Sequence, residues 1–166
     1  MGDLADAIKK IDRLQSAIEN ALEREVADVV RNAIAETAID LVYDAYDPEF
    51  LSRRDPKRGG GNTKASKARG GITDPSSVTV YVSGNELIAA DEAPWQQLWG
   101  GEIPNSALAD AIATGDKRFN MAKAGPRPFH AEAKKRLLES GEIEKALRAG
   151  LKRQGYDVSG LEFEIK

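Results

Sequence analysis

The sequence predicts an α+β fold, in which a long N-terminal helix and two C-terminal helices flank a small antiparallel sheet. From Asp3 to Asp47 there is no proline or glycine, and apolar residues recur at steps of three and four, as in a helix. Val78, Val80 and Val82 alternate with polar residues, as in a half-buried strand. Helical spacing returns near the C-terminus. Helical blocks around one hairpin are typical of the α+β class.

Composition limits the kind of protein this can be. The chain has 166 residues, of which 41% are hydrophobic and 31% charged, as in an ordinary soluble globular protein. This length favours a single domain over residues 1–166. There is no cysteine and only one histidine, His130. The sequence therefore excludes a disulfide scaffold and disfavours a zinc site and a Ser-His-Asp triad. We therefore expect no enzyme, no metal and no cofactor. No apolar run approaches the ~20 residues of a membrane span and no signal peptide is evident, so we expect an intracellular protein without a membrane partner.

The N-terminal helix begins near Asp3, a plausible N-cap, and ends before Pro48. Unbroken, it would be about 65 Å long at ~1.5 Å per residue, longer than a domain of this size is wide. Either the helix breaks, or residues 1–21 form a projecting arm that packs on another chain. Its apolar stripe is narrow before Leu22 and broader after it, which predicts an interface in the first half and core in the second.

Residues 52–71 are predicted to form a flexible basic loop, because the segment is rich in glycine and has no apolar periodicity. Between residues 52 and 69, seven bases stand against one acid, whereas residues 1–47 carry eleven acids and five bases. The bases are Arg53, Arg54, Lys57, Arg58, Lys64, Lys67 and Arg69. They suit contacts with acidic protein surfaces, simple solvation, or nucleic acid phosphates. The sequence leaves these three interpretations open.

The middle of the chain predicts the sheet. Residues 78–82 and 86–90 form the two strands of a hairpin, with Gly84-Asn85 as its turn. Trp95 and Trp99 lie four residues apart before a glycine pair, which predicts one helical turn with two aromatic anchors on one face. A short alanine-rich helix is expected over residues 106–115.

The C-terminal region predicts two helices, over residues 128–139 and 142–154, separated by Ser140-Gly141. Leu161, Phe163 and Ile165 then alternate with glutamates, which predicts a final strand.

The tetrad Pro126-Arg127-Pro128-Phe129 opens the first of these helices. The two prolines fix φ on both sides of the arginine, so the backbone enters the helix at a defined angle with Phe129 aimed at the core. Arg127 then presents its planar guanidinium in a fixed direction, which suits bidentate binding of a carboxylate or phosphate. The simpler interpretation is a helix start with an apolar anchor.

Three segments in order, YDPEFLSRRD, GGITDP and PRPF, resemble the neck or tail-completion proteins of long-tailed bacteriophages, as does LRAGLKRQGY near the end. The resemblance covers about residues 33–156. The chain departs from the family pattern in an enlarged basic insert at 56–69 and at 102–123.

The resemblance implies a structural protein of the virion neck or tail, assembled in the bacterial cytoplasm. It implies a ring of six or twelve copies that contacts head-completion, tail-terminator or tail-tube proteins and surrounds exiting DNA. Structural or interface roles are expected for Arg53, Arg54, Trp95, Trp99, Pro126, Arg127, Pro128 and Phe129. The alternative function is a nucleic-acid-binding module that uses residues 52–69.

Overall fold

The structure is a computed structural model that describes residues 2–44, 72–84, 86–92, 95–96, 102–103, 105–115 and 125–165. The predicted basic loop and its neighbours therefore lie outside the described residues. The contacts cluster into two units, the first with Met1–Val30, Val80–Ile88 and Leu137–Lys166 and the second with Arg31–Thr79 and Ala89–Arg136. A single domain over the whole chain stays a prediction.

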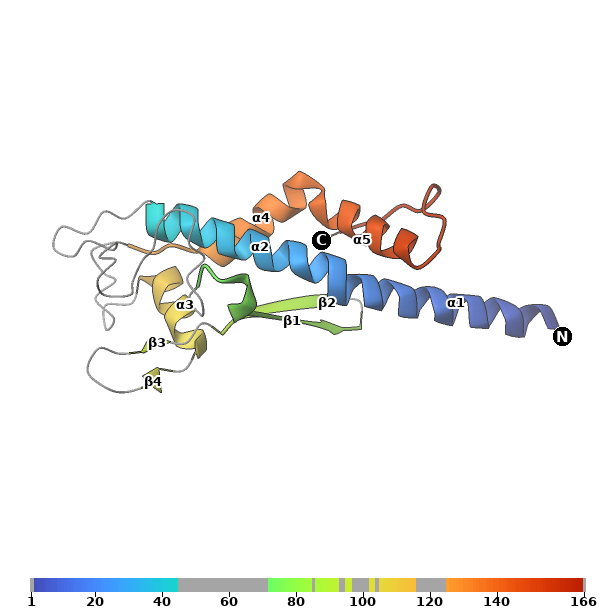
Figure 1. Cartoon of the computed structure of the whole chain (residues 1–166), viewed down its shortest axis with the longest axis horizontal. Helices are drawn as coiled ribbons and strands as arrows, with labels where there is room; N and C mark the ends of the chain where they lie inside the picture. Colours follow the sequence, from blue (N-terminus) through green and yellow to red (C-terminus); the bar gives the residue numbers. More distant parts are fainter. Residues whose placement is uncertain are drawn as a thin grey trace. The chain divides into compact units, whose positions relative to one another are not determined.

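The predicted long helix is confirmed, and it runs without a break from Gly2 to Asp44 (Figure 1). It contains two stretches of wider, π-helical turns, in which hydrogen bonds span five residues instead of four. The successive segments are α1 (Gly2–Ala21), η1 (Leu22–Val26), α2 (Ala27–Ala38) and η2 (Ile39–Asp44).

The wide turns explain how the buried face of the helix stays aligned. One row of buried residues advances by four positions at each step, except for a step of five from Ala21 to Val26: Ala17, Ala21, Val26, Val30, Ile34, Ala38 and Val42. In a regular α-helix a step of five would turn the second residue away by about 140°. The wider η1 turn absorbs the extra residue, so both side chains remain buried.

The predicted hairpin is also confirmed. A short 3-10 turn, η4 (Pro75–Ser77), leads into β1 (Val78–Ser83), which pairs with β2 (Glu86–Asp91) in a two-stranded antiparallel sheet. Asp74 caps η4 through its Oδ1 atom, which accepts a hydrogen bond from the backbone N–H of Ser76 at 2.9 Å.

The predicted helical turn at the tryptophans is wrong for Trp95. This residue lies in β3 (Trp95–Gln96), which pairs antiparallel with β4 (Glu102–Ile103), with Trp95 opposite Ile103. A partner strand further along the chain determines this conformation, so the spacing of the two tryptophans did not reveal it.

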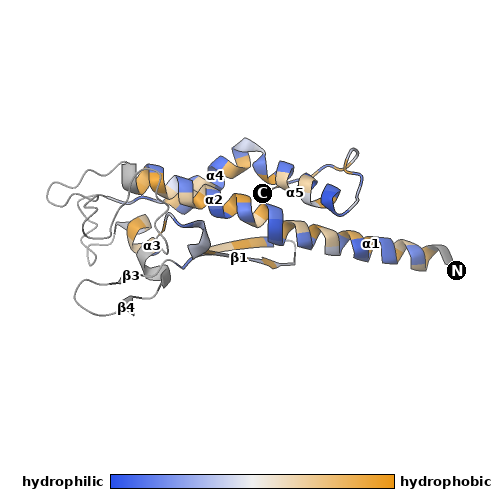
Figure 2. Ribbon diagram, viewed as in Figure 1, coloured by the Kyte–Doolittle hydropathy of each residue, from blue (hydrophilic) through white to orange (hydrophobic). Residues whose placement is uncertain are grey.

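Three further helices lie in the described part of the chain, close to their predicted ranges. They are α3 (Asn105–Thr114), α4 (Phe129–Ser140) and α5 (Glu142–Arg153). Within the first unit, α5 packs against α1 and η1 (Figure 1). Figure 2 shows apolar residues alternating with hydrophilic ones along the coloured part of α1.

The predicted final strand is wrong. Residues 161–165 alternate in polarity but form neither strand nor helix. Arg148 on α5 donates hydrogen bonds to the carbonyls of Val158 and Leu161, at 2.6 and 2.7 Å. A side chain therefore satisfies the Leu161 carbonyl, which a strand would offer to a neighbouring strand.

Candidate functional site

The proline-arginine tetrad joins three helical segments of the second unit. Phe129 is the first residue of α4 and is fully buried, as predicted. The carbonyl of Pro128 accepts the first hydrogen bond of this helix, from the N–H of Glu132 at 3.1 Å. The backbone N–H of Arg127 donates to the carbonyl of Ile112 in α3 at 3.1 Å. The tetrad thus starts one helix and satisfies a carbonyl of another.

The Arg127 side chain reaches the end of the long helix. Its Nη1 atom donates to the carbonyl of Val42, in η2, at 3.2 Å. The last carbonyls of a helix have no partner within the helix, and a positive charge there also complements the helix dipole. This contact joins Arg127 to a backbone carbonyl, and the predicted contact of Arg127 with acidic groups stays a prediction. A second arginine, Arg136 of α4, binds Asp40 of η2 at 2.6 Å.

The close approach of the tetrad to α3 depends on Gly115. This residue follows the last turn of α3 with φ of +68°, in the left-handed region. A Cβ atom placed there would lie 2.9 Å from the backbone nitrogen of Pro126. Only glycine meets both the conformational and the steric requirement.

The single histidine lies against the buried phenylalanine. The ring centroids of His130 and Phe129 are 4.0 Å apart, and the His130 Nε2 atom is buried without a hydrogen-bond partner among the described residues. Burial lowers the pKa of the imidazole below its ordinary value of 6.5, and the Asp110 carboxylate opposes this effect. The site therefore favours neutral His130.

This pKa shift predicts a pH dependence of stability. As pH falls through 6.5, the unfolded chain binds a proton at His130 before the folded chain does. The stability is therefore complete above this pH and is lost as pH falls toward the folded-state pKa. Between about pH 7 and about pH 5, the wild type should lose stability relative to His130→Leu, by at most about 1.4 kcal/mol per pH unit. Denaturant unfolding at each pH measures this, and parallel curves would contradict it.

The first unit contains a second close contact, between α5 and the long helix. A Cβ atom added at Gly150 would lie 2.6 Å from both the Ala21 Cβ and the Glu25 Oε2. Gly150 and Ala21 are both buried, so the two backbones approach closely through small residues. A glycine inside an otherwise helical pattern is the signal that could have revealed this contact.

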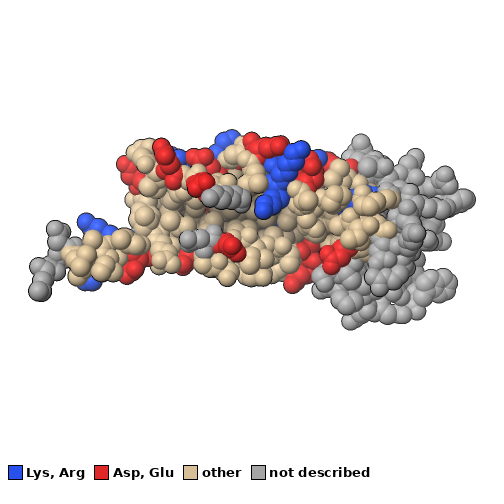
Figure 3. Space-filling view, turned by 180° about the vertical axis from the view of Figure 1, so that it is seen from behind, with Lys and Arg blue, Asp and Glu red and all other residues tan. Residues whose placement is uncertain are grey.

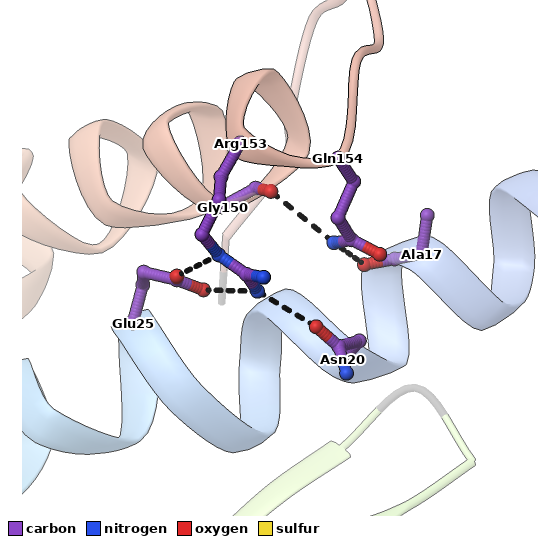
Figure 4. A network of polar contacts seen from close by, with 6 residues as sticks. All are labelled: Ala17, Asn20, Glu25, Gly150, Arg153 and Gln154. Atoms are coloured by element: carbon purple, nitrogen blue, oxygen red, sulfur yellow. Dashed lines mark hydrogen bonds and ion pairs between the residues drawn. The ribbon is translucent and has the colours of Figure 1, made fainter.

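Polar contacts border this small-residue contact (Figure 4). The Arg153 Nε donates to Glu25 Oε1 at 2.6 Å, and its Nη2 donates to Asn20 Oδ1 at 2.7 Å. Gln154 donates through Nε2 to the carbonyl of Ala17 at 2.8 Å. The hydrogen bond from Arg153 lowers the pKa of the Glu25 carboxyl group. None of these partners lies near Arg153 or Gln154 in sequence, so sequence reasoning missed them.

Arg148 holds the segment that follows α5. Besides its bonds to the two carbonyls, its guanidinium lies 5.1 Å from the centre of the Phe163 ring, and its Nε donates to Glu144 at 2.8 Å. This arrangement combines charge-assisted hydrogen bonds with a cation–π contact.

Three of the remaining predicted site residues lie in the described part of the chain. The backbone of Trp95 lies in β3, while Pro126 and Pro128 are exposed around Arg127. The others lie outside the described residues, and their roles stay predictions: Arg53, Arg54, Lys57, Arg58, Lys64, Lys67, Arg69 and Trp99. Among the described residues, no three carboxylate, histidine or cysteine side chains are grouped as metal ligands.

Comparison with family models shows to which protein family the chain belongs. The model of the YomN family matches residues 1–153. The chain belongs to the YomN family. YomN is a phage-derived family, of Bacillus prophage origin. The resemblance to a phage protein is thus confirmed at this level.

The YomN match ends at Arg153, the last residue of α5. It therefore includes the tetrad and the contact between Gly150 and Ala21, while the segment held by Arg148 follows it. No curated protein and no solved structure matches this YomN chain. No helix in the described part of the chain is both long and apolar enough to cross a bilayer.

Proposed function

We propose that this YomN-family protein is a structural component of a phage particle, located at the neck or the completed end of the tail. Its membership of a phage-derived family carries the proposal. The ordered segments that resemble neck and tail-completion proteins supply the more specific location. In this role the chain acts through protein contacts in a ring of copies.

The charge distribution supports assembly into a ring. Residues 1–47 carry a large excess of acids, and residues 52–69 a large excess of bases. Opposite charges at different places on one subunit favour head-to-tail contacts, which close into rings when the rotation permits. Such contacts weaken at high salt.

A nucleic-acid-binding module is the second candidate, favoured by the seven bases between residues 52 and 69. This function requires binding that falls by roughly one log unit per log unit of salt for each phosphate neutralised. The net charge of −3 for the whole chain and the absence of an aromatic residue from this segment count against it.

Light scattering of the full chain separates the two functions. The mass should be measured at low and high salt, with and without a purified phage connector or tail and with a DNA duplex. A ring, or a stoichiometric complex with connector or tail, would support the structural role. A monomer that binds neither connector nor tail, but binds DNA at low salt, would reject the structural role in favour of the second candidate.

Replacing Arg127 tests the anchoring role of the tetrad. Arg127→Ala removes the donor to the Val42 carbonyl, so the free energy of unfolding should fall by about 1 kcal/mol, and the yield of infectious particles should fall with it. Arg24→Ala, at an exposed position of η1, is the matched control and should change neither. A normal yield of particles from a phage carrying Arg127→Ala would remove the proposed role.

A further inference from the structure

The N-terminal part of α1 carries an exposed apolar face. Every residue from Leu4 to Arg13 is exposed, and the first buried side chain of the helix is Ala17. Leu4, Ile8 and Ile11 are nevertheless large and apolar, with exposed fractions of 72%, 51% and 64%. Isolated exposed apolar residues are common, but three on one face of a helix indicate a contact surface.

These residues belong to a repeat with the period of a coiled coil. The positions advance by alternating steps of four and three: Leu4, Ile8, Ile11, Gln15, Ile18, Leu22. Alternating steps of four and three are those of a heptad seam, which predicts pairing with another helix along this line. One polar residue, Gln15, occupies a seam position, and a polar seam residue fixes the register of pairing at some cost in affinity.

The described part of the chain covers the seam only in part. The close contact with α5 lies at Ala17 and Ala21, to one side of the seam, while Ile18 and Leu22 are half-buried. The face from Leu4 to Gln15 therefore extends beyond this contact. Figure 3 shows this end of α1 from behind, with acidic and basic side chains beside uncharged surface.

Charges identify the partner and its direction. Residues 3–16 contain three acids and three bases, so two copies of this segment do not repel through net charge. One border of the seam has Ala5, Asp12 and Glu19, and the other has only uncharged residues, Ala7, Leu14 and Ala21. Parallel helices place the acidic border of each copy against the uncharged border of the other, whereas antiparallel helices bring the two acidic borders to the same side.

We propose that residues 4–15 of α1 form a parallel, in-register coiled coil with the same segment of a second copy of this chain. The segment is only two heptads long and includes a polar seam residue, so the affinity is low. The pairing is therefore significant at high local concentration, as within an assembly that holds neighbouring copies together. This pairing does not depend on the proposed place in the virion.

Single cysteines test the pairing and its direction, since the natural chain contains none. Three full-length variants, Leu4→Cys, Ile11→Cys and Arg13→Cys, are equilibrated in a glutathione redox buffer over a range of protein concentrations. Leu4→Cys and Ile11→Cys should form disulfide-linked dimers, because a parallel seam brings identical positions together. Arg13→Cys, on the opposite face two residues away, should remain monomeric.

The contradicting outcomes are equally specific. Equal crosslinking of all three variants, or of none, would overturn the proposal. So would a mixture of Leu4→Cys with Gln15→Cys that forms mainly the mixed dimer, because that pairing requires antiparallel helices.

A measurement without crosslinks completes the test. In sedimentation of the cysteine-free chain, Ile8→Asp should weaken self-association at least tenfold, because it places a charge in the seam. Leu138→Asp, at an exposed position of α4, should leave it unchanged. A wild-type monomer that binds phosphatidylglycerol vesicles, and loses this binding with Ile8→Asp, would assign the face to a lipid surface and overturn the proposal.

Discussion

Phe129→Ala should lower the free energy of unfolding by about 3–5 kcal/mol, the largest loss that we expect from a single substitution. Phe129 has an exposed fraction of 0% and is among the largest fully buried side chains. Its removal leaves a cavity at the start of α4, beside His130 and close to Arg127, which binds the end of the long helix. Since domains are typically stable by about 5–15 kcal/mol, this is a large part of the total.

Denaturant unfolding of the full chain measures this loss. Leu138→Ala is the control on the same helix, because Leu138 is 42% exposed, and it should change stability by no more than about 0.5 kcal/mol. Phe129→Leu keeps most of the buried volume and should fall between the two. A cost below about 1 kcal/mol for Phe129→Ala would mean that the tetrad does not anchor α4 through its aromatic ring.

Gly150→Leu should be the second most damaging change, at about 2–3 kcal/mol. The added side chain would begin 2.6 Å from the Ala21 Cβ and 3.1 Å from the Ala21 Cα, which is backbone and cannot rotate away. The added side chain would therefore push α5 away from α1 and η1, and the packing between these helices would be lost in part. Gly150→Ala should cost less, because the gain of about 1 kcal/mol in helix propensity offsets part of the clash.

The neighbouring residue supplies the matched control. Ala149 is exposed on the same turn of α5, so Ala149→Leu should leave the free energy of unfolding nearly unchanged. Combining Gly150→Ala with Ala21→Gly removes one of the two clashing Cβ atoms and should recover part of the loss in a double-mutant cycle. If Gly150→Leu and Ala149→Leu lowered the free energy of unfolding equally, the close approach of Gly150 to Ala21 would not be needed for stability.

Local patterns were sufficient to predict the principal helices and the hairpin. The steps of three and four predicted a helix over Asp3–Asp47, and the structure has it from Gly2 to Asp44, where the described residues pause; alternating valines predicted β1. The proline tetrad correctly marked the start of α4, and Gly141 separates α4 from α5. In each case the determining residues lie within a few positions of the structure that they determine.

Non-local contacts account for the errors. Trp95 is extended because it pairs with Ile103, and the segment ending at Ile165 forms no strand while Arg148 binds carbonyls before and within it. The step of five from Ala21 to Val26 does not fit an α-helical period and is explained only by the wider turn. None of these arrangements follows from local spacing.

The candidate site was predicted in part. Burial of Phe129 follows from its place after a proline at a helix start, but the carbonyl that the Arg127 side chain binds lies 85 positions away. The contacts of Gly150 and Arg153 with the long helix are equally remote in sequence. The bases of residues 52–69 lie outside the described residues, so their interpretation stays a prediction.

The position of Arg153 has a mechanical consequence for the long helix. Arg153 binds Asn20 before the wide η1 turn and Glu25 within it. The end of α5 therefore links the two sides of that turn. A helix under tension yields first where its hydrogen bonds are least regular. A pull on the N-terminal part of α1 would thus be shared between the backbone of η1 and the attached α5. We expect this sharing to reduce the stretching of the long helix at the η1 turn.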